Sequence, residues 1–129
     1  MRKFAVLIAL VALAGPAEAQ DHWAGATIVP VRLSSFDFTP EEIVLPAGRP
    51  VVLRLHNASG GGHNFAARDF FRAAQVRPGD QAKVVHGEVE VRGGTTVDVG
   101  LVPAAGRYRL RCTHTFHTAL GMRGTIVVR

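Results

Sequence analysis

Hydrophobic and polar residues alternate along three stretches of the chain. Residues 51–55, 97–101 and 108–112 each place an apolar side chain at every second position. This period of two is typical of a strand with one face against a core and the other toward solvent, so each stretch is predicted to be a half-buried antiparallel strand. In the third stretch, Cys112 shares the inward positions with Tyr108 and Leu110. The cysteine is therefore expected to face inward at the end of a core strand.

Turn-forming residues separate these strands at regular intervals. They occur at 39–40, 46–48, 57–62, 78–80, 93–94 and 105–106. Short strands with such spacing predict an all-β fold, a β-sandwich of about seven or eight strands with Greek-key connections. The stretch 66–76 lacks strict alternation, and a short helix or an irregular crossing between the sheets is expected there.

The first 19 residues have the pattern of a secretory signal peptide. Arg2 and Lys3 form a basic start, an apolar run follows, and Ala17-Glu18-Ala19 is a small-residue cleavage site. The apolar run is too short to span a bilayer comfortably. We therefore predict a signal peptide over 1–19 and a single exported domain over 20–129, located in the periplasm.

The chain is basic, with a formal net charge of +5. Removing the predicted signal peptide leaves the balance basic. The arginines are scattered rather than clustered in sequence, which describes either a solvated surface or a surface that steers an acidic redox partner. Nucleic-acid binding is not expected in this compartment.

The single cysteine lies in a stretch with the spacing C-x4-H-x4-M, formed by Cys112, His117 and Met122. A lone cysteine in an exported protein is an intermolecular disulfide partner, a free thiol or a metal ligand. With His63 added, the chain offers one thiolate, two imidazoles and one thioether. These are the donors of a blue-copper site, in which two His and one Cys are joined by a weak axial Met. His63 follows three glycines, which allow the backbone to approach the site closely. It precedes Cys112 by about 50 residues, so it is expected at the end of a different strand.

The chain resembles the cupredoxins, the small blue-copper proteins typified by plastocyanin, azurin and rusticyanin. The resemblance rests on the segments 62–65, 108–113 and 121–128 together with His117. It implies a cupredoxin-like sandwich with one type-1 copper that carries single electrons between redox proteins, such as a c-type cytochrome or an oxidase. It also implies that Asn64 and Thr113 brace the ligands, with the Asn64 backbone N–H directed at the cysteine sulfur. A monomer is expected.

Copper trafficking or storage is the alternative function. It usually requires exposed clusters of Met and His, and the chain has only two methionines. Catalysis is not expected, because multicopper oxidases place His on both sides of this cysteine, whereas Arg111 and Thr113 occupy those positions here. Phe65 and Phe116 are candidates for an apolar shell around the metal, and core packing is an equal interpretation of Phe65.

Two further histidines have separate interpretations. His114 lies only two residues after Cys112, and is interpreted as exposed near the copper rather than as a ligand. Cleavage after Ala19 would place His22 third in the mature chain, where a free amine and His can form an auxiliary Cu(II) site. Cyclisation of the N-terminal Gln20 would remove that amine.

Overall fold

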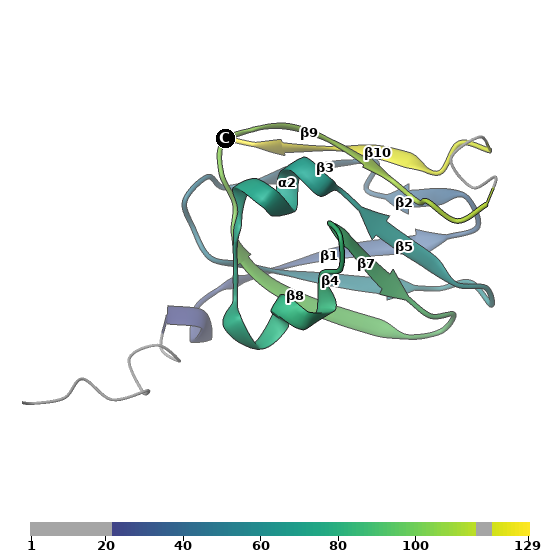
Figure 1. The fold of residues 1–129 in the computed structure, drawn as a ribbon, viewed down its shortest axis with the longest axis horizontal. Coiled ribbons are helices and arrows are strands. Elements are labelled where there is room, and N and C mark those ends of the chain that lie inside the picture. The colour runs from purple at the N-terminus through teal and green to yellow at the C-terminus, as the bar shows by residue number, and fades with distance from the viewer. Residues whose placement is uncertain (1–21, 116–119) are drawn as a thin grey trace, which may run out of the picture.

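The computed structural model describes residues 22–115 and 120–129. Two five-stranded sheets form the layers of a sandwich (Figure 1), with strand orders β2-β1-β4-β8-β6 and β3-β10-β9-β5-β7. The strands of the first sheet are β1 (Thr27–Ser34), β2 (Asp37–Thr39), β4 (Val51–Asn57), β6 (Gln75–Val76) and β8 (Thr96–Val102). Those of the second are β3 (Glu42–Leu45), β5 (His63–Ala66), β7 (Glu88–Val91), β9 (Gly106–Arg111) and β10 (Arg123–Val128).

The all-β sandwich expected from the alternation is confirmed. The described residues form ten strands rather than seven or eight, because short strands such as β2 and β6 join the sheet edges. Two neighbouring pairs, β1 with β4 and β3 with β10, run parallel. The sheets are therefore mixed, whereas the alternation had suggested antiparallel pairing alone.

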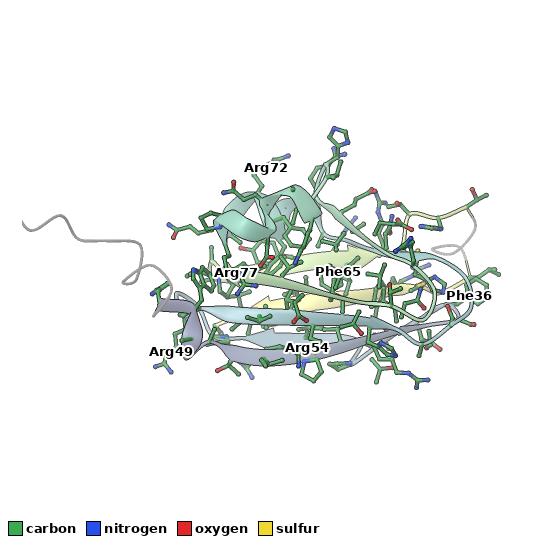
Figure 2. All side chains as sticks on the ribbon, turned by 90° about the horizontal axis from the view of Figure 1, so that it is seen from below. Phe36, Arg49, Arg54, Phe65, Arg72 and Arg77 are labelled. Atoms are coloured by element: carbon green, nitrogen blue, oxygen red, sulfur yellow. The ribbon has the colours of Figure 1, made fainter. Side chains whose placement is uncertain are left out.

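Burial follows the predicted faces. Leu53, Val99 and Leu110 are among the inward residues of β4, β8 and β9 that solvent does not reach. Phe65 lies between the two layers (Figure 2) and packs edge-to-face against Phe38 and Phe71. Core packing is thus the role that the structure gives Phe65.

The stretch 66–76, expected to be a short helix or an irregular crossing, contains a short helix, α2 (Arg68–Ala73), which buries Phe70 and Phe71 against the core. It is followed by β6 and by a 3-10 helix, η1 (Pro78–Lys83). None of the helices in the described part of the chain is long and apolar enough to cross a membrane.

Candidate metal centre

Three strand ends meet at one end of the sandwich. Strand β9 ends there, and β5 and β10 begin there (Figure 1). Arg111 in β9 lies opposite Arg123 in β10 and also opposite Ala66 in β5. This pairing brings the residues just after β9 close to those at the start of β5 and just before β10.

His63 and Cys112 form the centre of this end. The Nδ1 atom of His63 lies 3.9 Å from the Sγ atom of Cys112. His63 is only 4% exposed and Cys112 is 0% exposed. His63 is the first residue of β5, a strand end as expected, because β5 pairs with β7 from His63 onward. The histidine is consequently held by the pairing of β5 with β7 in addition to the loop that precedes it.

Met122 is the neighbour of Cys112 across the sheet. The Cys112 backbone N–H donates to the Met122 carbonyl at 3.1 Å, one step beyond the paired Arg111 and Arg123. Residues directly opposite each other in an antiparallel pair share a face, and both side chains are fully buried. The thiol and the thioether therefore point into the same layer. Gly121 precedes Met122 with a φ of +99°, a backbone conformation that favours glycine.

Asn64 joins β5 to the segment after β9. Its backbone N–H donates to Cys112 Sγ at 3.5 Å. Its side chain donates from Nδ2 to Thr113 Oγ1 at 2.7 Å and accepts from the Thr113 backbone N–H at 2.8 Å. These three bonds place Asn64 and Thr113 directly beside the sulfur.

Two carboxylates of β7 belong to the same network, and sequence reasoning missed them. Glu88 accepts hydrogen bonds from Thr113 Oγ1 at 3.2 Å and from Asn64 Nδ2 at 3.4 Å. Glu90 contacts the Nε2 atom of His114 at 2.8 Å. The alternating segment 88–91 gave no sign of this role, because outward glutamates in a strand look like an ordinary solvent face.

His114 is half-buried rather than exposed. Besides its contact with Glu90, its ring centroid lies 6.4 Å from that of His63. His114 is thus a neighbour of the candidate ligands, on the side of β7.

Burial raises the pKa of the Cys112 thiol. The backbone N–H groups of Asn64 and His114 act in the opposite direction, while the charges of Glu90 and Glu88 add to the increase. The net direction is upward, so the metal-free thiol holds its proton at neutral pH. A metal ion that binds here has to displace that proton, which makes its affinity dependent on pH.

The residues at this end fit a metal ion. Two ligand atoms bound to one ion at about 2.0–2.3 Å lie roughly 3.5–4 Å apart, and His63 Nδ1 and Cys112 Sγ lie 3.9 Å apart. Both are shielded from water, with a thioether in the same layer. Sulfur and imidazole donors of this kind suit copper, and they also accept zinc.

Other predicted site residues lie outside the described part of the chain. They are His117 and Phe116, as well as Gln20 and Asp21, on which the auxiliary site at His22 depends. Within residues 22–115 and 120–129, His, Cys, Asp and Glu form no group of three or more that could hold a metal. The predicted copper site therefore needs His117 as a ligand in addition to His63 and Cys112, and Met122 as its thioether.

Comparisons with known proteins agree with the fold. The family model of the cupredoxin-like domain matches residues 3–128. Auracyanin from Roseiflexus castenholzii is 19% identical with a TM-score of 0.61, over 81% of this chain and 99% of that chain. Auracyanin A of Chloroflexus aurantiacus, described as a "blue" copper protein, is 24% identical with a TM-score of 0.54, over 79% of this chain and 99% of that one.

The same fold occurs within a larger enzyme. The multicopper oxidase McoA of Aquifex aeolicus is 17% identical with a TM-score of 0.62, over 81% of this chain but only 30% of that one. No curated protein sequence matches the chain. The structural similarities establish a shared sandwich fold, and the family model spans nearly the whole sequence. The chain therefore belongs to the cupredoxin-like domain family.

Proposed function

We propose that this protein is a type-1 blue-copper electron carrier. His63, Cys112, His117 and Met122 would hold one copper ion. When bound, copper supplies a one-electron Cu(I)/Cu(II) couple. The protein would pass single electrons between redox proteins and would not act as an enzyme.

The observation that carries this proposal is the buried pair of His63 and Cys112, with 3.9 Å between Nδ1 and Sγ. The two residues are 49 positions apart; His63 begins β5, and Cys112 directly follows β9 in the same sheet. Donors fixed by separate strands change position little when the charge at the site changes. A small structural change on electron transfer is what a carrier requires.

The surrounding residues support the same role. The Asn64 backbone N–H donates to the sulfur, and a hydrogen bond of this kind orients a ligand and tunes the potential of a bound metal. The closed core excludes water from Cys112 and Met122. Arg111 and Thr113 flank the cysteine, so the chain lacks the His neighbours that multicopper oxidases use to pass electrons onward.

The cellular setting is part of the proposal. Residues 1–19 would direct export and be removed, and 20–129 would act as a monomeric domain in the periplasm. A c-type cytochrome or an oxidase would be a suitable redox partner. Mass spectrometry of the exported protein would test cleavage after Ala19, and a free amine on Gln20 would keep the auxiliary Cu(II) site at His22 open. A different or blocked N-terminus would remove that site.

Titration of Cu(II) into the purified domain tests the main proposal. We expect an intense visible thiolate-to-copper band at one equivalent, absent in Cys112→Ser and retained in the control His56→Gln. His56 is exposed on β4 and bonds only to Thr96 among the described residues. Reduction and reoxidation should return the band without loss of copper. Weak absorption with ready transfer of copper to a chelator would instead support trafficking or storage.

A further inference from the structure

The outer face of β9 carries a row of arginines. Arg107, Arg109 and Arg111 alternate with inward residues and are all exposed. Arg107 has a carboxylate nearby, with its Nη2 atom 3.9 Å from Glu42. Arg109 and Arg111, which are nearer the metal end, form no ion pair with a carboxylate among the residues that the structure describes.

The next strand adds a positive charge at the metal end. Arg123 lies directly opposite Arg111, and both side chains are on the outer face. Like charges in directly opposite positions destabilise a sheet. The two arginines adjoin Met122 and Cys112 in sequence, so this unfavourable pair sits immediately outside the candidate metal centre.

A cavity of about 300 Å³ opens beside Arg111, on the side of β9 that faces β5. Strands β5 and β9 are paired only through Ala66 and Arg111, and the cavity lies where they separate. Three guanidinium groups, an imidazole and a hydroxyl line it, and we call it the arginine notch: Arg68, His86, Arg109, Arg111 and Thr113.

The carboxylates at the notch already have partners. Asp69 lies 3.7 Å from Arg72 on the same helix. Glu88 accepts the hydrogen bonds of Thr113 and Asn64. The ion pairs found among the described residues use none of the three arginines of the notch. Their N–H groups are therefore available to an acceptor from outside.

We propose that the arginine notch binds carboxylate groups of an acidic redox partner and docks that partner beside the metal centre. This inference rests on the proposed electron-carrier function. The planar guanidinium offers paired donors that match a carboxylate. A positive face also raises the rate of encounter with a negatively charged protein. Thr113, the residue after Cys112, lines the notch, so a docked partner would lie close to the cysteine.

The first test needs no copper. Metal-free, ¹⁵N-labelled protein is titrated with hexacyanochromate(III), a redox-inert paramagnetic trianion, and with a hexaglutamate peptide. We expect saturable broadening of the Ala66, Gly87 and Thr113 amides by the chromium complex, and competition by the peptide. The double variant R109Q/R111Q should bind about tenfold more weakly, since hydrogen bonds to charged groups contribute about that factor.

The matched control is the double variant R49Q/R129Q. It removes the same charge, and Arg49 lies at the end of the sandwich away from Phe36 and the metal centre (Figure 2). Equal weakening in both double variants would show a general charge effect and overturn the proposal. Binding of inorganic phosphate without competition by hexaglutamate would assign the notch to a small anion and would also overturn it.

The second test uses the copper-loaded protein. Oxidation by anionic hexacyanoferrate(III) is compared with oxidation by cationic tris(phenanthroline)cobalt(III). R109Q/R111Q should slow the anionic oxidant about tenfold and spare the cationic one, whereas R49Q/R129Q should change either rate less than twofold. Similar rates in all three proteins would refute docking at the notch. If copper does not bind, the electron-carrier function fails while the metal-free titration still decides whether the notch binds carboxylates.

Discussion

Replacement of Asp80 by Asn removes a buried negative charge beside strand β8. Asp80 is only 4% exposed. Its carboxylate accepts hydrogen bonds from Arg77 Nε at 2.6 Å and from the Gly100 backbone N–H at 2.8 Å, and it lies 2.8 Å from Lys83 Nζ. These contacts fasten the 3-10 helix η1 to β8, where β6 pairs with only two residues of that strand.

The size of the effect follows from these contacts. Burial by itself would raise the pKa of Asp80, but the hydrogen bonds from Lys83, Gly100 and Arg77 outweigh it and lower that pKa. A hydrogen bond to a charged group contributes about 1.5–3 kcal/mol. In D80N the amide oxygen can still accept from the Gly100 N–H, but as a weaker neutral bond. Arg77 and Lys83, which are 29% and 42% exposed, lose their anionic partner and recover only part of that interaction from water. We expect D80N to lose about 3 kcal/mol, or roughly 10–20 °C in Tm.

The stability difference between wild type and D80N should depend on pH in a defined direction. Because folding lowers the pKa of Asp80, its stabilisation is present above the unfolded pKa of about 3.9 and is lost as the pH falls through the lower folded pKa. Wild type and D80N should therefore differ fully at pH 7, and the difference should begin to shrink near pH 4 and disappear as the pH falls through the folded pKa.

Urea unfolding of the metal-free protein, followed by circular dichroism, measures both effects. D98N is the control, because Asp98 on β8 pairs at 3.0 Å with Arg54 on the neighbouring strand β4, and this pair is in contact with solvent. An exposed pair contributes at most about 1 kcal/mol. A D80N loss no larger than that of D98N, or a difference that persists in acid, would refute the reasoning.

Two further predictions concern the metal end. N64A removes two side-chain hydrogen bonds with Thr113 and should cost about 1–2 kcal/mol in urea unfolding; a change below about 0.5 kcal/mol would contradict a bracing role. G93A would place a Cβ 2.5 Å from the carbonyl oxygen of Gly60, so the loop before His63 must move. We expect lower stability and a shifted copper band, while G61A, whose Cβ meets no atom within 4 Å, should match wild type. Identical spectra in both glycine variants would show that this loop does not position the histidine.

The alternation of side chains predicted which faces of β4, β8 and β9 are buried, and with them the burial of Cys112. It succeeded because each of these strands has one face on the core and one toward solvent. The resemblance to cupredoxins then predicted which backbone N–H is directed at the sulfur. The metal role of the four expected ligands stays a prediction.

The features that the sequence did not predict depend on pairing between segments far apart in the chain. Glu88 faces Ala66 and Glu90 faces Asn64 only because of the register between β5 and β7, and alternation within one strand carries no information about register. Asp80 had been interpreted as part of a turn signal, and its burial results from the packing of η1 against β8. The parallel pairing of β1 with β4 and of β3 with β10 could not be predicted either, because side chains alternate in the same way in parallel and antiparallel strands.

The same register explains why the metal end depends on Asn64. Backbone pairing joins β5 to β9 only at Ala66 and Arg111, so the sheet alone fixes the two strands to each other at one position. Two residues closer to the metal end, the Asn64 side chain forms two hydrogen bonds with Thr113, and its backbone N–H reaches Cys112. These contacts act where further backbone pairs are missing. The distance between His63 and Cys112 is therefore set by side-chain hydrogen bonds as much as by the sheet, and disrupting Asn64 should disturb the site more than its modest cost in stability suggests.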